Sequence, residues 1–183
     1  MLKMVVCVDK NGAIGNKGGL LTHNKEDMQY FKKVTSGDTV LMGNNTYKSL
    51  PMYPKGLPNR RNIVFTTDVK RALDLEYKHT TDPWIGLGLP RPIRTLFFTS
   101  GVRSLFKDCI ESVDDFWCIG GASIYEQCKP YVQEVHISRM NKTFESDTFI
   151  NLDFLSDFYL DNTIKLNYYT TVEVYKRKNN GIF

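Results

Sequence analysis

The feature that most constrains the fold of this chain is the alternation of short apolar runs with segments of helical pattern. The apolar runs predict strands at Met1–Asp9, Thr39–Met42, Asn62–Thr66, Thr95–Thr99, Phe116–Ile119 and Val132–Met140. The segments between them predict helices at Lys25–Ser36, Asn44–Leu50, Val102–Ile110 and Ala122–Cys128. Strands that alternate with helices in this way favour an α/β fold, with a mostly parallel central β-sheet flanked by about four helices.

The C-terminal part of the chain has a different period. Hydrophobic residues fall on even positions, with mostly polar residues between them, at Ile164, Leu166, Tyr168, Val172 and Val174. A period of two indicates strands with one buried face, so we expect an antiparallel C-terminal edge that closes the sheet.

Length and composition indicate a single domain, residues 1–183. A chain of 183 residues can bury a proper core, and it contains no internal repeat and no low-complexity segment. Prolines and glycines cluster at Pro83–Pro92, where they predict an excursion loop and not a domain linker.

Charge and hydropathy argue against several classes of protein. The net charge is +4 and the basic residues are scattered, with Lys176–Lys178 as the nearest approach to a basic stripe, so we expect no nucleic-acid partner. No segment approaches the roughly 18 apolar residues of a membrane span, and the apolar run at the N-terminus is too short for a signal peptide. We therefore expect a cytoplasmic protein with no membrane partner. We also expect a monomer.

Cysteines and histidines give no sign of a metal site. Cys7, Cys109, Cys118 and Cys128 form no C-x-x-C pair, and the three histidines stand far apart. We expect free thiols in a reducing compartment and no bound metal.

One acidic residue stands out on the first predicted helix. At 3.6 residues per turn, Asp27 stacks with Phe31 and Val34 on the apolar side, whereas Glu26 points to the polar side. No Lys or Arg stands three or four residues from Asp27 to neutralise it. Asp27 can simply stabilise the helix N-terminus, for which Asn24 is a suitable cap. Alternatively, a carboxylate that faces the core needs a partner, and a cationic or amidine-like ligand would supply one.

Two short segments have the order strand, glycine, helix start, which suits anion binding. They are Val40–Thr46 (VLMGNNT) and Cys118–Ser123 (CIGGAS). Helix N-termini present free backbone N–H groups, and glycine lets an anion approach the backbone. Glycine before a helix is also common for packing reasons, but two such segments in one α/β sheet fit a dinucleotide pyrophosphate. Neither segment is the G-x-G-x-x-G fingerprint of an ordinary Rossmann site.

Together, motifs along most of the chain resemble those of the dihydrofolate reductase family. They occur in the family's order and at near-family spacing: Ile14-Gly15, Asp27–Lys32 (DMQYFK), Val40–Pro51 (VLMGNNTYKSLP), Leu57–Thr66 (LPNRRNIVFT), Ile119–Gln127 (IGGASIYEQ), His136–Arg139 (HISR) and Asp147–Phe149 (DTF). Each motif alone is modest, whereas the ordered set is specific. The chain is similar to a divergent member of the family, such as one encoded by a bacteriophage.

The resemblance implies which residues bind the substrate. Asp27 corresponds to the family's sole ionisable active-site carboxylate, which grips N3 and the 2-amino group of the pterin, and Ser138 corresponds to the hydroxyl residue bonded to that acid. Arg60 corresponds to the arginine that clamps the α-carboxylate of the substrate's glutamate. The other implied substrate positions are the backbone carbonyls of Val6 and Ile119, and Cys7, Met28, Phe31, Leu50 and Leu57.

The resemblance also implies an NADPH cofactor and a reaction. The implied cofactor positions are Cys7, Ile14, Leu20, Gly43, Asn44, Asn45, Thr46, Thr66, Thr67, Ile119, Gly120, Gly121, Ala122, Ser123, Ile124, Tyr125 and Thr148. The implied reaction is hydride transfer from the nicotinamide C4 of NADPH to C6 of dihydrofolate, with a proton from solvent reaching N5. The implied partners are dihydrofolate and antifolates such as methotrexate or trimethoprim, in one-carbon metabolism.

The chain departs from the family pattern at two functional positions. The family's Pro-Trp before the substrate helix is here Leu21-Thr22. The Thr22 hydroxyl can hold the water that the tryptophan normally holds, with less bulk to exclude solvent. After Gly43, where the family commonly has a basic residue that reads the cofactor's 2′-phosphate, stands Asn44. The candidates to take over that role are Thr66, Thr67, Lys70 and Arg71.

Two other functions are open at the level of sequence. A pyrimidine reductase of riboflavin synthesis has the same fold, but its substrate carries a ribosyl phosphate instead of a glutamate, which Asp27 and Arg60 do not suit. A non-catalytic folate- or nucleotide-binding structural protein is compatible with Leu21-Thr22. The combination of Asp27, Ser138 and Arg60 favours an enzyme over both.

Overall fold

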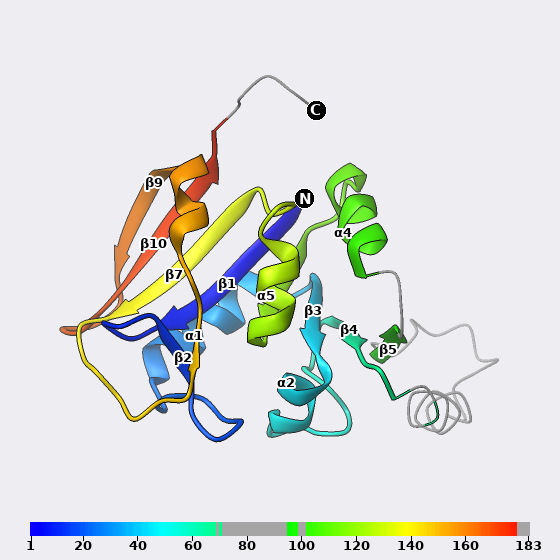
Figure 1. The fold of residues 1–183 in the computed structure, drawn as a ribbon, viewed down its shortest axis with the longest axis horizontal. Coiled ribbons are helices and arrows are strands. Elements are labelled where there is room, and N and C mark those ends of the chain that lie inside the picture. Colours follow the sequence, from blue (N-terminus) through cyan, green and yellow to red (C-terminus); the bar gives the residue numbers. More distant parts are fainter. Residues whose placement is uncertain (69, 71–94, 99–101, 179–183) are drawn as a thin grey trace.

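Eight strands form one central sheet in the order β5-β4-β3-β6-β1-β7-β10-β9 (Figure 1). The computed structural model describes residues 1–68, 70, 95–98 and 102–178. The strands of this sheet are β1 (Leu2–Val8), β3 (Thr39–Gly43), β4 (Arg61–Phe65), β5 (Thr95–Phe98), β6 (Phe116–Gly120), β7 (Glu134–Met140), β9 (Phe158–Lys165) and β10 (Thr170–Arg177). A small second sheet pairs β2 (Ala13–Gly15) with β8 (Thr148–Phe149).

Helices cover both faces of the central sheet. They are α1 (Lys25–Thr35), α2 (Asn44–Ser49), α4 (Val102–Glu111), α5 (Ala122–Cys128) and the 3₁₀ helix η1 (Asp153–Asp157). In Figure 1, α4 and α5 lie on the near face of the sheet and α1 lies on the far face. Because parallel strands need crossover connections, α1, α2, α4 and α5 lie between successive parallel strands along the chain, whereas η1 precedes the antiparallel strand β9.

The strand pairing confirms the predicted fold class. The strands from β5 to β7 in the sheet order pair in parallel, whereas β10 runs antiparallel to both β7 and β9. The chain moves from β1 out to β3, β4 and β5, then returns to β6, which lies between β3 and β1, and crosses to β7. In α/β sheets, ligands bind at the carboxyl ends of the strands where the strand order reverses. The topology therefore points to the carboxyl ends of β1, β3 and β6.

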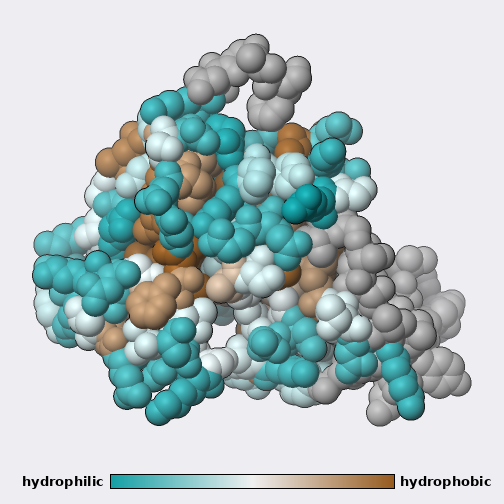
Figure 2. Space-filling view, in the orientation of Figure 1, coloured by the Kyte–Doolittle hydropathy of each residue, from teal (hydrophilic) through white to brown (hydrophobic). Residues whose placement is uncertain are grey.

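Two hydrophobic clusters fill the two sides of the sheet. The larger cluster contains residues of α4 and α5 such as Phe106 and Cys128. The smaller cluster contains Tyr47 and Trp117 and takes apolar side chains of α1, such as Phe31. The surface of the near face is mostly hydrophilic, with hydrophobic atoms gathered left of its centre (Figure 2).

The start of α1 is fixed as the sequence predicted. The Asn24 side-chain oxygen accepts a hydrogen bond from the Asp27 backbone N–H at 3.3 Å, which caps the helix. The Asn24 side-chain nitrogen donates to the Thr170 hydroxyl at 2.8 Å. The cap therefore also attaches the N-terminal end of α1 to β10.

Some predictions of the sequence are wrong or lie outside the described residues. Tyr168, expected on a buried strand face, lies in the turn between β9 and β10 and is 80% exposed, because the chain reverses there. Val172 and Val174 are buried on β10, which confirms the alternation for that strand. The strand predicted from Val132 begins at Glu134. The loop predicted at Pro83–Pro92 lies outside the described residues.

The described residues contain no helix that is long and apolar enough to cross a membrane. They also contain no group of three or more His, Cys, Asp or Glu side chains placed to hold a metal ion. Cys109, Cys118 and Cys128 are free and buried, whereas Cys7 is partly exposed.

Candidate functional site

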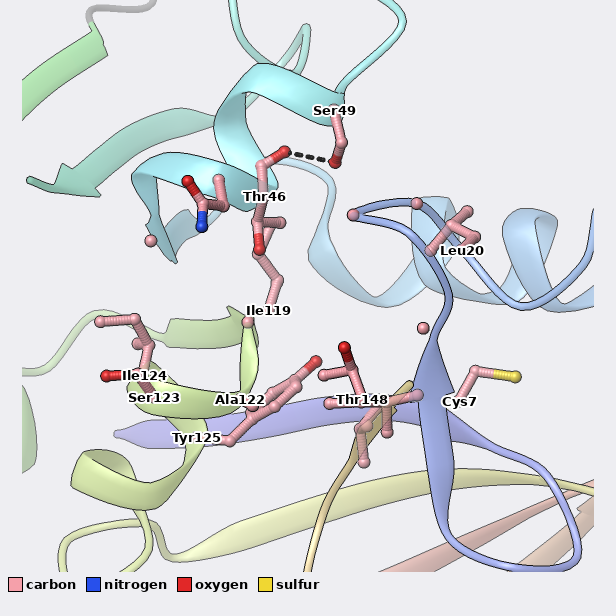
Figure 3. Close-up of a pocket in the computed structure, with 18 of the residues that line it drawn as sticks. Cys7, Leu20, Thr46, Ser49, Ile119, Ala122, Ser123, Ile124, Tyr125 and Thr148 are labelled. Atoms are coloured by element: carbon pink, nitrogen blue, oxygen red, sulfur yellow. Dashed lines mark hydrogen bonds between the residues drawn. The ribbon is translucent and has the colours of Figure 1, made fainter. Parts of the chain in front are cut away.

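A cavity of about 770 Å³ lies at the carboxyl ends of the parallel strands, where the topology places a ligand. Its walls come from the ends of β1, β3, β4 and β6, from the loop at residues 15–22, and from the first turns of α1, α2 and α5 (Figure 3). The residues predicted for the site that line this cavity are Val6, Cys7, Ile14, Leu20, Thr22, Asp27, Met28, Gly43, Asn44, Asn45, Thr46, Thr66, Thr67, Ile119, Gly121, Ala122, Ser123, Ile124, Tyr125 and Thr148.

Six residues predicted for the site lie off the cavity walls: Phe31, Leu50, Leu57, Arg60, Gly120 and Ser138. Phe31, Leu50 and Leu57 pack against the smaller hydrophobic cluster, and so does the cavity residue Ile119. Ile119 and these three side chains therefore border the same hydrophobic cluster.

Leu21, which stands with Thr22 at the position of the family's Pro-Trp, also lines the cavity. Sequence reasoning missed other lining residues, namely Gly15, Gly18, Gly19, Asn24, Ser49, Phe65, Gln127 and Met140. Several of them stand next to a predicted residue in the chain. Met140 lies two positions after Ser138 on β7, so the period of two along a strand was a usable signal.

The N-terminal ends of α2 and α5 meet across the cavity (Figure 3). Their N-caps are Gly43 and Gly121, and neither supplies a side-chain hydrogen bond to the helix. The first backbone N–H groups of both helices are therefore not capped by a side chain. A Cβ atom on Gly121 would lie 3.3 Å from the Thr46 hydroxyl oxygen, so glycine permits the close approach of the two helices.

A buried hydrogen bond joins α5 to β1 beside the cavity. The Tyr125 hydroxyl donates to the backbone carbonyl of Val5 at 2.9 Å. The Tyr125 ring packs against Gly120, whose φ of +107° and whose ideal Cβ position, 2.8 Å from that ring, both require glycine. Val5 does not itself line the cavity.

Asp27 is the one carboxylate on the cavity walls formed by the described residues. It is half-buried, whereas Glu26 is exposed, which confirms the division of the two acids between the helix faces. Burial raises the pKa of the Asp27 carboxyl above its usual value, and the Ser138 hydroxyl and Cys7 thiol partly offset this rise. Lys, Arg and His are absent from the described walls, so the carboxylate has no cationic partner there.

Ser138 is 1% exposed and lies on β7, in register with Cys7 on β1. Its hydroxyl is close enough to Asp27 to lower the pKa of the carboxyl. Yet it is the one buried side-chain polar atom in the described part of the chain that has no hydrogen-bond partner of normal length. A buried polar group without a partner is rare in proteins, and it indicates a place for a water molecule or a ligand.

The loop at residues 15–22 forms one wall and is tied to the connection between β7 and β8. The Lys17 backbone N–H donates to the Asp147 carboxylate at 2.8 Å, and the Asp147 backbone N–H donates to the Gly15 carbonyl at 3.2 Å. Leu20, labelled in Figure 3, lines the cavity but stays 71% exposed. The loop therefore presents an apolar side chain that a ligand could cover.

The side chain of Arg60, which stands just before β4 in the chain, packs beside the C-terminal end of α1 and is 3% exposed. Its Nε donates to the Thr35 hydroxyl at 2.7 Å, its Nη1 to the Pro58 carbonyl at 2.7 Å and its Nη2 to the Lys32 carbonyl at 3.2 Å. The guanidinium carbon also lies 5.5 Å from the centre of the Phe31 ring. An arginine has five N–H donors, so one is left on each terminal nitrogen, an arrangement that suits the two oxygens of a carboxylate.

Comparisons with known proteins agree with this geometry. A family model of dihydrofolate reductase matches residues 1–167 of the chain. Dihydrofolate reductase of Bacillus subtilis (strain 168) is 29% identical over 147 residues, which cover 80% of this chain and 73% of that protein. Dihydrofolate reductase type 9 of Escherichia coli is 30% identical over 159 residues, which cover 87% of this chain and 81% of that protein.

A solved structure shows the same fold. The dihydrofolate reductase from Enterococcus faecalis complexed with NADP(H) and RAB-propyl has a TM-score of 0.73 to this structure at 23% sequence identity. The similarity covers 98% of this chain and 97% of that chain. With a family model that spans most of the sequence and relatives that match over most of their length, the chain belongs to the dihydrofolate reductase family.

Proposed function

We propose that this protein catalyses the NADPH-dependent reduction of 7,8-dihydrofolate to 5,6,7,8-tetrahydrofolate by hydride transfer. The observation that carries the proposal is the half-buried Asp27, which has no cationic partner on the described walls and stands beside the unpartnered hydroxyl of Ser138. Membership of the family supports the same reading of the cavity.

Asp27 and Ser138 suit the pterin end of the substrate. An ionised carboxylate accepts hydrogen bonds through two oxygens, which match the adjacent N3 and 2-amino groups of a pterin. The Ser138 hydroxyl has capacity left for a water molecule that bridges to the same ring. Pairing with these donors would favour the charged form of Asp27, which burial alone disfavours.

The tail of dihydrofolate has a path from the cavity to Arg60. Ile119 lines the cavity, and Phe31, Leu50 and Leu57 pack against the same hydrophobic cluster as Ile119. Phe31 in turn contacts the guanidinium of Arg60. We assign the benzoyl ring to this apolar path and the α-carboxylate of the glutamate to the two remaining donors of Arg60.

The part of the cavity between α2 and α5 suits NADPH. Phosphate groups bind well where helix N-termini leave backbone N–H groups uncapped, as at Gly43 and Gly121, and the Thr46 and Ser123 hydroxyls stand beside them. The relative from Enterococcus faecalis was solved with NADP(H), which supports the same cofactor for this chain. When bound, NADPH supplies the hydride. The residues of this chain would orient the two ligands and exclude water between them.

A product of this kind would serve one-carbon metabolism, including thymidylate synthesis, in the cytoplasm. A cavity built for the pterin should also take antifolates such as methotrexate or trimethoprim, which carry a similar pattern of ring nitrogens and amino groups.

The test is the loss of NADPH absorbance when dihydrofolate is added to the purified protein. We expect turnover that methotrexate inhibits, and a large loss of turnover in Asp27→Asn. Glu26→Gln is the matched control, because Glu26 is the neighbouring acid on the exposed side of α1. Absence of methotrexate-sensitive turnover, or an Asp27→Asn variant as active as wild type, would reject the proposal.

A further inference from the structure

The middle of α1 is held to the sheet by a chain of polar contacts to which the proposed reaction gives no role. Tyr30, three residues after Asp27, places its hydroxyl 2.8 Å from His136 Nδ1, and His136 Nε2 lies 2.9 Å from a carboxylate oxygen of Glu134. His136 is 8% exposed, and its ring packs edge-on against Trp117, with 4.9 Å between the ring centres. The imidazole is therefore fixed by a tyrosine, a carboxylate and an aromatic ring.

These contacts stand next to the Ser138 hydroxyl, which is close enough to Asp27 to lower the pKa of its carboxyl. Side chains alternate along a strand, so Glu134, His136 and Ser138 share the face of β7 that lies under α1. Asp27 and Tyr30 are three residues apart and share one face of α1. Asp27 lies near Ser138, and Tyr30 is hydrogen-bonded to His136. Two residues of α1 therefore each face one residue of β7.

We propose that Tyr30, His136 and Glu134 form a positioning relay that sets the register of α1 on β7 and thereby the position of the Asp27 carboxylate. The inference rests on the proposed function, since it assigns these residues a role through Asp27. In the described structure all three lie off the cavity walls, so they are positioning residues and not catalytic ones. Binding groups must be held within about 0.5 Å of their productive geometry, so a small shift of α1 would be felt at the pterin.

Titratable groups on several elements surround His136. They are Tyr30 on α1, Glu134 on β7, Lys3 on β1, whose Nζ lies 3.6 Å from Glu134 and 2.7 Å from Asp115, and Lys176 on β10, which pairs in register with Glu134. The direct strand neighbours of His136 are the apolar Val5 and Val174. Glu134 thus shares Lys3 with Asp115, and Lys176 forms an ion pair with Asp161 on β9 at 2.8 Å.

These surroundings define the direction of each hydrogen bond. The hydrogen bond from His136 lowers the pKa of the Glu134 carboxyl, so near neutral pH Glu134 is charged and can only accept. Burial, with Glu134 and Asp27 nearby, raises the pKa of Tyr30 to about 12, so Tyr30 keeps its proton. In neutral His136, Nε2–H therefore donates to Glu134, and Nδ1 accepts from the Tyr30 hydroxyl.

Substitutions of His136 can break the two halves of the relay separately. The amide of asparagine occupies roughly the place of Nδ1, and the amide of glutamine roughly the place of Nε2. His136→Asn should therefore keep a partner for Tyr30, whereas His136→Gln should keep only the contact with Glu134. Tyr30→Phe removes the hydroxyl and leaves the aromatic packing. Tyr159→Phe, on the edge strand β9, is the control for loss of a tyrosine hydroxyl.

The readouts are the pH profile of kcat/KM for dihydrofolate and the pKa of Asp27. The pKa comes from NMR of protein labelled with ¹³C-aspartate, in which Asp27→Asn identifies the signal. For Tyr30→Phe and His136→Gln we expect kcat/KM to fall about 3- to 10-fold, as for one lost buried hydrogen bond. We also expect the Asp27 titration to move and the KM for NADPH to stay unchanged. His136→Asn, which keeps a partner for Tyr30 and loses the contact with Glu134, should have a smaller effect than His136→Gln, and Tyr159→Phe should behave like wild type.

The outcomes separate this inference from the proposed function. If the wild type turns over but Tyr30→Phe and His136→Gln keep its pH profile and its Asp27 titration, the relay is overturned, whatever their melting temperatures. Equal effects of the Asn and Gln variants would also overturn it, because they would indicate simple packing. A wild type without turnover would overturn the proposed function instead, and the NMR titration would still decide whether the relay positions Asp27.

Discussion

Replacing Arg60 by leucine removes a buried cation that makes three hydrogen bonds and has two donors to spare. The spare donors, one on each terminal nitrogen, match the two oxygens of the glutamate α-carboxylate. A hydrogen bond to a charged group contributes about 1.5–3 kcal/mol, and about 1.4 kcal/mol corresponds to a factor of ten. We therefore expect Arg60→Leu to raise the KM for dihydrofolate about 10- to 100-fold.

The same substitution should lower the free energy of unfolding by about 1–3 kcal/mol. Thr35, Pro58 and Lys32 each lose a charged donor. The loss is limited because the Thr35 hydroxyl keeps its own bond to the Phe31 carbonyl at 2.7 Å. The loss of stability is limited further because burial disfavours the charged form of Arg60, as its lowered pKa indicates, and leucine carries no charge to bury. Since Arg60 also anchors α1, weaker substrate binding alone would not distinguish the carboxylate clamp from the anchor.

Steady-state rates with two substrates make that distinction. The compound 6-methyl-7,8-dihydropterin keeps the pterin but lacks the benzoylglutamate tail, so Arg60→Leu should leave its KM within about twofold of wild type. Arg61→Leu is the matched control, because Arg61 is the adjacent arginine and is exposed. Arg60→Lys keeps the charge but not the planar fork, so its KM for dihydrofolate should lie between the values of the wild type and of Arg60→Leu. An equal rise for both substrates, or an unchanged KM for dihydrofolate, would refute the reasoning.

Three other substitutions test the carboxylate, the cofactor end and the backbone of the site. Because burial raises the pKa of Asp27 in the folded protein, Asp27→Asn should stabilise the ligand-free protein in thermal melts above that raised pKa. This gain in stability should shrink as the pH falls and vanish below the ordinary pKa of aspartate. A gain that persists in acid would show that it does not come from the buried charge of Asp27. Asn44→Arg should raise the ratio of kcat/KM for NADPH over NADH about tenfold or more, since a cation on α2 can bond the 2′-phosphate, and an unchanged ratio would place that phosphate elsewhere. Gly120→Ala should cost about 1–3 kcal/mol in urea denaturation, because its φ is +107° and its Cβ would meet Tyr125, and a neutral result would show that the turn can relax.

Local patterns predicted most elements of the fold because the interactions that define them are local. The start of α1 depends on a contact between Asn24 and Asp27, three residues apart, and it was predicted correctly. The alternation of hydrophobic residues failed at Tyr168, because periodicity does not show where a strand reverses. The pairing of β2 with β8 was missed, because strands of three and two residues are too short to carry a pattern.

The site could be predicted only in part from residue types. The helical pattern gave Asp27 its inward face, and the two strand–glycine–helix segments do border one cavity. His136 shows the limit of such reasoning, since its partner Tyr30 lies 106 residues away and the contact depends on how α1 packs on the sheet. The fork of free donors on Arg60 is likewise visible only once its three acceptors are in place.

The packing of α1 also predicts that substitutions under α1 affect binding of the substrate and not binding of the cofactor. Hydrogen bonds hold α1 to the rest of the protein along its length, among them Asn24 to Thr170 at 2.8 Å, Tyr30 to His136 at 2.8 Å, and Arg60 to Thr35 at 2.7 Å. By contrast, the end of the cavity that we propose for the cofactor phosphates is built from α2, α5 and the end of β4. Tyr30→Phe, which loosens the middle of α1, should therefore weaken methotrexate binding and leave NADPH binding unchanged when each is measured by calorimetry. Equal weakening of both ligands would show that α1 and the cofactor end shift together, and the register of α1 would then not be a control on the substrate alone.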